Sequence, residues 1–189
     1  AVAPAMKPTL AGEAPRETVT ASRLPETAQS KVHVDAARKL AGNDEDLMKT
    51  WTFFCTPVNY NAPGPVLEAA KVFDNLYFVG QTEYSAWAVT TSAGIIVIDP
   101  LFDYSVADEV AGGLETLGLN PADIKFVVIS HGHSDHAGRA SFLQDRYKAR
   151  VVVSAEDWDL MDRTGGSWRK PRRDIVAKDG HLVTLGDTT

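Results

Sequence analysis

Short apolar runs separated by turn-forming residues occupy the middle of the chain. Four runs rich in β-branched and aromatic residues lie at 71–73, 76–80, 86–91 and 94–98. Strands of this length with short connections are typical of consecutive antiparallel pairing. The pattern therefore predicts an antiparallel meander that ends at Asp99–Pro100.

A helix is predicted directly after this meander. Ser105 is placed to cap it, with Asp108 at the third helical position of a capping arrangement, and Gly118 is placed to end it. Between these residues, apolar positions recur at helical spacing and predict one buried stripe, formed by Val106, Val110, Leu114 and Leu117.

The next part of the chain alternates between strand and helix. Strands are predicted at 126–129 and 150–153, with a helix at about 137–147 between them. A further helix follows, which Ser154 is placed to cap together with Asp157. A strand, a helix and a strand in this order favour parallel pairing through a right-handed crossover.

Near the end of the chain, Asp179–Gly180 predicts a hairpin turn between strands at 175–176 and 181–185. Strands thus come first as a meander and then alternate with helices. This order predicts the α/β (α+β) class, with a mixed sheet faced by helices.

The N-terminal part of the chain carries a different pattern. Residues 1–30 contain four prolines and no hydrophobic period, so we expect an extended leader there. A short helix is predicted at 34–40, and Asn43 is placed to cap a second one. We therefore expect a leader with a short helix at 1–45 and the globular domain at 46–189.

Composition and charge narrow the classes of function. Hydrophobic residues make up 44% of the chain and charged residues 23%, as in ordinary globular proteins. The net charge of −6 argues against a nucleic-acid partner, because phosphate binding needs clustered lysine and arginine. No apolar run is long enough to span a membrane, and the single cysteine, Cys55, allows no internal disulfide. Ala1–Ala5 fits the remainder of a cleaved signal peptide, so we expect a periplasmic or secreted protein, and otherwise a cytoplasmic one.

The candidate chemistry is concentrated in one loop, His131-Gly132-His133-Ser134-Asp135-His136, which follows the strand predicted at 126–129. His131 and His133 are two residues apart, so extended backbone would point their rings to the same side. Neutral imidazole and carboxylate are zinc ligands, and a catalytic zinc keeps one position open for water. Water bound there ionises near neutral pH and becomes the nucleophile. We therefore predict a metal site in this loop.

This loop resembles the HxHxDH signature of the metallo-β-lactamase fold hydrolases. The resemblance extends upstream to the strand Gly94–Asp99, downstream to Val151–Ser154, and in all over about residues 70–189. It is nearest to the zinc β-lactamase subclass without a cysteine ligand and its relatives. The resemblance implies an αββα sandwich, of which this chain would supply the N-terminal half.

The resemblance also implies roles for individual residues. It assigns His131 and His133 to a first zinc ion, and Asp135 with His136 to a second. Asp135 would orient the attacking hydroxide or accept its proton, and is the expected catalytic residue. Asp99 is the best candidate to hold a histidine ring through its other nitrogen, although a turn-forming role before Pro100 is equally open.

The family completes its site with ligands further downstream, and this sequence offers few candidates for them. Among the five histidines, only His181 follows the loop, and its surroundings do not match the family's pattern; His33 lies in the leader. We therefore expect a C-terminal fragment or a second chain to complete the fold.

The expected function is a zinc-dependent hydrolase that opens a cyclic amide or ester of a small molecule, with β-lactams as the leading substrate. The alternatives are a lactone or thioester hydrolase of the same superfamily, a non-catalytic half-domain that needs a second chain, and an iron-based oxidoreductase on the same fold.

Overall fold

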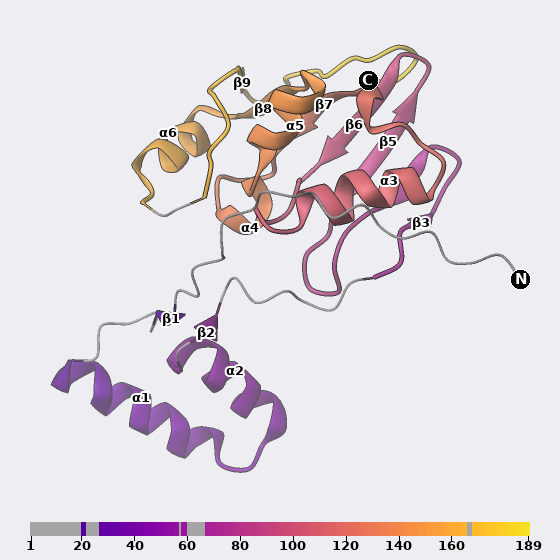
Figure 1. Cartoon of the computed structure of the whole chain (residues 1–189). Coiled ribbons are helices and arrows are strands. Elements are labelled where there is room, and N and C mark those ends of the chain that lie inside the picture. Colours follow the sequence, from indigo (N-terminus) through magenta and orange to yellow (C-terminus); the bar gives the residue numbers. More distant parts are fainter. Residues whose placement is uncertain (1–19, 22–26, 57, 60–66, 166–167) are drawn as a thin grey trace, which may run out of the picture. The chain divides into compact units, whose positions relative to one another are not determined.

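The computed structural model describes residues 20–21, 27–56, 58–59, 67–165 and 168–189 (Figure 1). The chain divides into two compact units, residues 1–62 and residues 63–189. The leader expected at 1–30 falls mostly outside the described residues, and the domain division expected from the sequence stays a prediction.

The first unit contains a pair of helices and a short two-stranded sheet. Its elements are β1 (Thr20–Ala21), α1 (Ala28–Ala41), α2 (Glu45–Cys55) and β2 (Val58–Asn59). The indole nitrogen of Trp51 on α2 donates to the carbonyl of Val34 on α1 at 3.0 Å, which ties the two helices together. Asp44, not Asn43, caps α2, because its carboxylate reaches the amides of both Asp46 and Leu47.

The second unit is built on a seven-stranded mixed sheet in the order β3-β4-β5-β6-β7-β8-β9. Pairing is antiparallel from β3 to β6 and parallel from β6 to β8, as the predicted meander and crossovers require, and β9 adds a further parallel strand beside β8. The strands are β3 (Ala70–Lys71), β4 (Leu76–Phe78), β5 (Trp87–Thr91), β6 (Gly94–Ile98), β7 (Ile124–Val128), β8 (Arg150–Ser154) and β9 (Ile175–Ala177).

Short helices connect the parallel strands. A π-helix, η1 (Val106–Ala111), continues into α3 (Gly112–Thr116), and a 3₁₀ turn, η2 (Pro121–Asp123), leads into β7. The later helices are α4 (Ser134–Ala137), α5 (Ala140–Tyr147) and α6 (Ala155–Arg163). None of the helices in the described part of the chain is long and apolar enough to cross a membrane.

One face of the sheet carries the core. The strand register aligns Ala88 with Val97, Val97 with Val127, and Val127 with Val151, and all four side chains are fully buried. Helices cover this face: α5 lies against β7 and β8, α6 lies against β8 and β9, and η1 with α3 packs into the same core (Figure 1). Their buried residues in the same core are Val106, Val110, Leu114, Leu143, Trp158 and Met161.

The opposite face of the sheet is also apolar. Because side chains alternate along a strand, the next residues in the register point the other way. They form a row across five strands, consisting of Trp87, Ile98, Val128, Val152 and Ile175. Val152 is buried, but the other four side chains of this row are only partly buried.

The predicted hairpin at Asp179–Gly180 was wrong. A turn does form there, with the amide of His181 donating to the carbonyl of Lys178 at 2.9 Å. However, β9 pairs in parallel with β8, and the described residues after the turn form no strand. The edge of the sheet offers β9 an apolar neighbour, whereas most of the residues after the turn are exposed.

Two helix predictions also need correction. The helix predicted at about 137–147 begins only at Ala140, as α5, and Gly138 separates it from the short helix α4 in the preceding loop. A β-carbon at Gly138 would lie 1.7 Å from the carbonyl oxygen of Leu101, so the backbone here passes directly against the loop that follows β6. Ser105 does not cap its helix, because its buried hydroxyl donates to the carbonyl of Phe102 instead.

Candidate metal centre

The candidate residues lie where the parallel strands end. Asp99 follows β6, the loop from Ser130 to His136 follows β7, and Ser154 with Asp157 follows β8. Parallel neighbours place their carboxyl ends at the same edge of a sheet, where α/β proteins bind their ligands. Three segments that are distant in the sequence therefore meet at one edge.

The loop after β6 has a strained backbone. Asp99 and Leu101 both have positive φ angles, 55° and 61°, which non-glycine residues rarely adopt. The side chain of Leu101 is fully buried, and its carbonyl lies against Gly138. Packing thus holds Asp99 in a conformation that a free loop would leave, as is common at functional sites.

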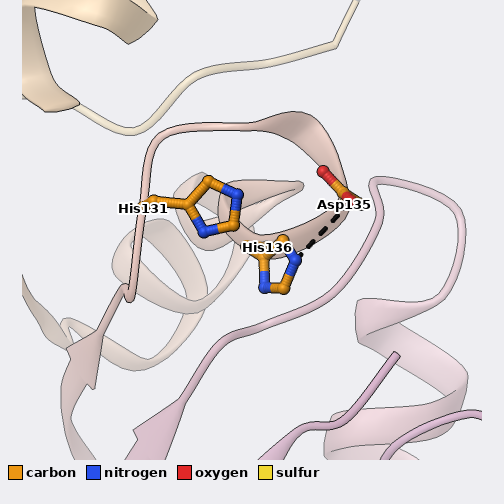
Figure 2. A group of neighbouring side chains, drawn as sticks. All are labelled: His131, Asp135 and His136. Atoms are coloured by element: carbon orange, nitrogen blue, oxygen red, sulfur yellow. Dashed lines mark ion pairs between the residues drawn. The ribbon is translucent and has the colours of Figure 1, made fainter. Parts of the chain in front are cut away.

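The loop from Ser130 to His136, called the metal loop from here on, turns back on itself as α4 begins. The carbonyl of His133 accepts hydrogen bonds from the amides of His136 and Ala137, at 3.1 and 2.7 Å. This turn places Asp135 and His136 in a short helix that folds back beside His131 (Figure 2).

His131, Asp135 and His136 form a compact group of donors. Each offers one ligand atom, and these three atoms all lie within 4.8 Å of one another. Nε2 of His136 is 3.5 Å from Oδ2 of Asp135, and the two imidazole rings of His131 and His136 are 4.1 Å apart between centroids. Among the residues that the structure describes, no second group of three such donors is present.

His133 lies next to this group but outside it. Its ring centroid is 4.9 Å from that of His131, at a nearly perpendicular angle, and the residue is exposed. The structure therefore gathers three of the four residues expected to bind metal. His33 and His181 are exposed and belong to no such group within the described chain.

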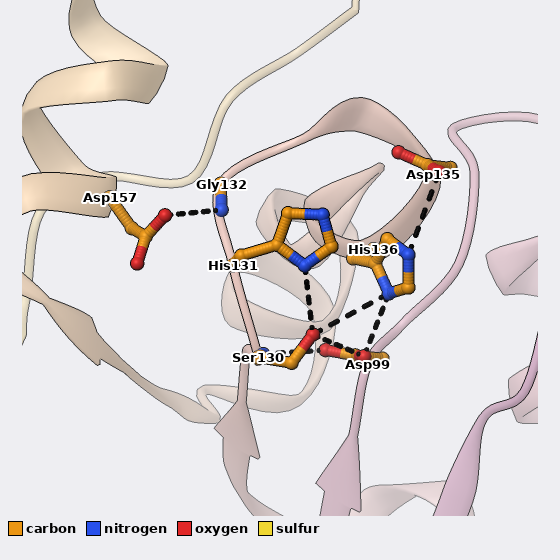
Figure 3. Close-up of polar contacts among 7 residues, drawn as sticks. All are labelled: Asp99, Ser130, His131, Gly132, Asp135, His136 and Asp157. Atoms are coloured by element: carbon orange, nitrogen blue, oxygen red, sulfur yellow. Dashed lines mark hydrogen bonds and ion pairs between the residues drawn. The ribbon is translucent and has the colours of Figure 1, made fainter.

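Asp99 connects the strand end to the histidines (Figure 3). Its Oδ1 accepts the backbone amide of Ser130 at 2.7 Å, and its Oδ2 accepts the Ser130 hydroxyl at 2.7 Å. Oδ2 also lies 2.9 Å from Nδ1 of His136. Asp99 is therefore placed where the sequence suggested a residue that orients a histidine.

This arrangement fixes the tautomers of two rings. A carboxylate only accepts hydrogen bonds, so Nδ1 of His136 carries the hydrogen and donates it to Asp99. The Ser130 hydroxyl, which donates to Asp99, is left to accept from Nδ1 of His131 at 3.2 Å. In both rings Nε2 is then the nitrogen that is left to act as a ligand atom.

The same contacts shift the pKa values. Burial alone would raise the pKa of the Asp99 carboxyl, but hydrogen bonds from His136 and Ser130 outweigh it and hold the pKa below its ordinary 3.8. The hydrogen bond to Asp99 raises the pKa of His136 above 6.5. Burial, with the nearby His136 and His133, lowers the pKa of His131 below 6.5, so that ring is neutral at neutral pH.

The donor set fits a divalent cation of the zinc type. Imidazole nitrogen and carboxylate oxygen are the usual ligands of zinc. A histidine that binds zinc usually donates its other ring N–H to a carboxylate, which orients the ring. The described group supplies both of these ligand types, imidazole and carboxylate.

Two contacts at the site were not expected from the sequence. Ser130 links Asp99 to both histidines, and Asp157 accepts the amide of Gly132 at 2.9 Å. Asp157 was predicted only as part of a helix cap, and its position at the end of β8 was the signal that it could reach the loop. Among the nearby aromatic residues, the ring of Tyr84 lies 6.4 Å from that of His136, whereas Trp158 is buried in the core.

Comparisons with known proteins agree with this geometry. The family model of the metallo-beta-lactamase superfamily matches residues 79–189, more than half of the chain. A UPF0173 metal-dependent hydrolase of Anaeromyxobacter dehalogenans is 28% identical over 116 residues, covering 57% of this chain and 40% of the relative.

Solved structures with the same fold include two metallo-beta-lactamases. BJP-1 of Bradyrhizobium japonicum, of subclass B3, has a TM-score of 0.62 and 26% identity, covering 69% of this chain and 52% of BJP-1. FEZ-1 of Legionella gormanii has a TM-score of 0.60 and 26% identity, covering 67% and 52%. The chain thus spans about half the length of the proteins it matches. By its sequence and its fold, it belongs to the metallo-beta-lactamase superfamily.

Proposed function

We propose that the protein is a zinc-dependent hydrolase that opens a cyclic amide or ester of a small molecule, with β-lactams as the first class to test. The observation that carries the proposal is the group of His131, Asp135 and His136, whose ligand atoms lie within 4.8 Å at the carboxyl edge of the sheet. The likeness to solved B3 enzymes supports β-lactams over lactones and thioesters, which remain the alternatives.

In this proposal His131 and His133 hold a first zinc ion, and Asp135 and His136 hold a second. Zinc in such a site lowers the pKa of a bound water and stabilises negative charge on a carbonyl oxygen. Asp135 orients the attacking water and takes up its proton. Asp99 and Ser130 keep Nε2 of both neighbouring histidines directed at the site, so each ring is ready to bind without reorganising.

The apolar outer face of the sheet supports a further part of the proposal. Trp87, Ile98, Val128 and Ile175 lie in one apolar row on this face and are only partly buried. We propose that a C-terminal segment or a second chain packs there and supplies further ligands. Without that layer the chain would be a non-catalytic half-domain, which is the second candidate function.

Two further parts of the proposal concern the class of substrate and the location of the protein in the cell. The net charge of −6 does not favour nucleic acid as a ligand, which agrees with a small-molecule substrate. We also propose a periplasmic or secreted location as the one to test first. Fractionation of the source cells would test this location, and recovery in the cytoplasmic fraction would contradict it.

The proposed function is tested by measuring zinc binding and hydrolysis on the same protein. The full chain is titrated with Zn²⁺ against a chromogenic chelator, and hydrolysis of a chromogenic cephalosporin is then followed with and without zinc. We expect His131→Ala to weaken zinc binding and to abolish hydrolysis. His181→Ala is the matched control, because it removes an exposed histidine outside the group.

The outcomes separate the candidates. Zinc binding with hydrolysis that His131→Ala removes supports the enzyme. Zinc binding without hydrolysis of cephalosporins, lactones or thioesters supports the half-domain. Equal zinc affinity in wild type and His131→Ala would contradict the ligand assignment.

A further inference from the structure

Two carboxylates hold the backbone of the metal loop on either side of His131. Asp99, from the end of β6, accepts the amide of Ser130 at 2.7 Å. Asp157, from the first turn of α6, accepts the amide of Gly132 at 2.9 Å (Figure 3). The peptide units Ile129–Ser130 and His131–Gly132 are therefore both held by charged acceptors, which form stronger hydrogen bonds than neutral ones.

Asp157 is itself held in place. The hydroxyl of Ser154 donates to its Oδ2 at 2.7 Å and accepts from its backbone amide at 3.1 Å. The next residue, Trp158, is 1% exposed, and its indole donates to the carbonyl of Ile175 at 3.1 Å. The carboxylate thus stands on a turn of helix that is anchored in the core and on β9, which suits it to orient another group.

The loop also packs tightly on that turn. Gly132 is buried, and a β-carbon there would lie 2.7 Å from the backbone oxygen of Asp157 and 3.1 Å from the side chain of Met161. A buried amide needs a partner, because leaving it unpaired costs about 1–3 kcal/mol. Without Asp157, the backbone between His131 and His133 would have to move to find another acceptor.

We propose that Asp157 is a positioning residue for the metal centre. Both of its oxygens are engaged, one with Gly132 and one with Ser154, so it acts on the site through the loop and not as a ligand. By fixing the amide of Gly132, it sets the directions in which the side chains of His131 and His133 point from the backbone. The inference rests on the proposed function, because it assumes that these histidines bind zinc.

A purely structural role would have a different consequence. Ser154 caps α6, and Asp157 sits in the acidic first turn, where a carboxylate favours the helix through its dipole. Loss of that effect would lower thermal stability and leave the zinc affinity of the folded protein unchanged. Zinc affinity and melting temperature therefore distinguish the two roles.

The experiment compares the full-length wild type with Asp157→Ala, Asp157→Asn and Glu156→Ala. Glu156 is the exposed neighbour in the same first turn, so its replacement removes the same charge near the same helix end. Zinc affinity is measured by competition with a chromogenic chelator, and the melting temperature of the metal-free protein by circular dichroism. We expect Asp157→Ala to weaken zinc binding by about 10-fold or more, the usual effect of losing a group that orients ligands.

The two other variants complete the comparison. Asp157→Asn keeps an oxygen for the Gly132 amide and should retain most of the affinity, and Glu156→Ala should bind zinc as the wild type does. If Asp157→Ala does not fold, Asp157→Ser replaces it, because serine is polar but too short to reach Gly132, and the same loss of affinity is expected.

Unchanged zinc affinity in Asp157→Ala, or an equal loss in Glu156→Ala, would overturn the inference and leave the proposed function standing. Failure of the wild type itself to bind zinc would defeat the proposed function and this inference with it.

Discussion

The side-chain amide of Gln81 donates to Oε1 of Glu109 at 2.9 Å, joining the loop after β4 to the π-helix η1. The other oxygens of the two groups, Oε1 of Gln81 and Oε2 of Glu109, are both buried and accept no hydrogen bond from the residues that the structure describes. Burial raises the pKa of the Glu109 carboxyl above its ordinary 4.5, and the hydrogen bond from Gln81 opposes only part of this. If a hydrogen-bond donor replaced Oε2 of Glu109, it could donate to Oε1 of Gln81, and neither residue would keep an unpaired buried oxygen.

Glu109→Gln should supply that donor. Its amide can donate to Gln81 while its oxygen accepts from Gln81, so we expect a gain of about 0.5–1 kcal/mol in the free energy of unfolding at pH 7. Urea unfolding followed by tryptophan fluorescence measures it. Glu115→Gln, at an exposed position of α3, is the control and should change little.

The same pair predicts a pH dependence. A carboxyl whose pKa is raised on folding favours the folded state below its unfolded pKa, and this advantage is lost as pH rises through the folded pKa. The wild type should therefore lose stability relative to Glu109→Gln as pH increases from about 4.5. Unfolding curves at pH 4 and pH 7 test this, and an equal difference between the two proteins at both values would contradict it.

Asp99→Asn should weaken zinc binding. Asparagine tolerates positive φ and can still accept the Ser130 amide, so the loop should keep its shape. It lacks the charge and the second oxygen that hold His136, and we expect about a 10-fold loss of zinc affinity. The chelator competition described above measures it; Asp179→Asn, in an exposed turn, should bind as the wild type does.

Gly138→Ala should destabilise the second unit strongly. The added carbon would lie 1.7 Å from the carbonyl oxygen of Leu101, and neither backbone segment can yield cheaply. We expect a loss of about 3 kcal/mol or more, seen as a lower melting temperature by circular dichroism. Gly165→Ala, where an added carbon meets nothing within 4 Å, is the matched control, and an equal effect from both would refute the packing argument.

Replacing Asp174 should lower the free energy of unfolding more than replacing Arg150, although the two residues form one ion pair. Asp174 accepts three hydrogen bonds from the Arg150 side chain and one from the amide of Val151 at 3.0 Å. The Arg150 side chain is 57% exposed, so Arg150→Ala should cost less than about 1 kcal/mol. Asp174→Ala also leaves the Val151 amide unpaired and should cost about 1–2 kcal/mol. Urea unfolding of the two variants gives both values, and an equal cost would mean that the Val151 contact contributes nothing.

Local patterns in the sequence were enough to predict the parts of the fold that depend on neighbouring residues. The stripe of Val106, Val110 and Leu114 is buried as its spacing indicated, and the meander and parallel strands follow their hydrophobic runs. The cap of α6 by Ser154 also forms as predicted.

The parts that failed depend on residues far apart in the chain. Gly138 interrupts a helical pattern because a carbonyl from the loop after β6 lies against it, which no local signal records. The π-helical start of η1 and the parallel pairing of β9 likewise depend on what the rest of the sheet offers. For the candidate metal centre, the ligands expected from the sequence stay a prediction, and the exposure of His133 and the bond from Asp157 to Gly132 appear only in three dimensions.

The contacts that hold the metal loop have a consequence for the order of folding. Ser130 and Gly132 take their acceptors from residues 31 positions before and 25 positions after them. Both acceptors come into reach only when β6, β7, β8 and the start of α6 stand side by side, and closing such long loops is slow compared with forming a helix. Zinc uptake should therefore lag behind the appearance of helical signal during refolding, which makes the metal a reporter of the last stage of assembly.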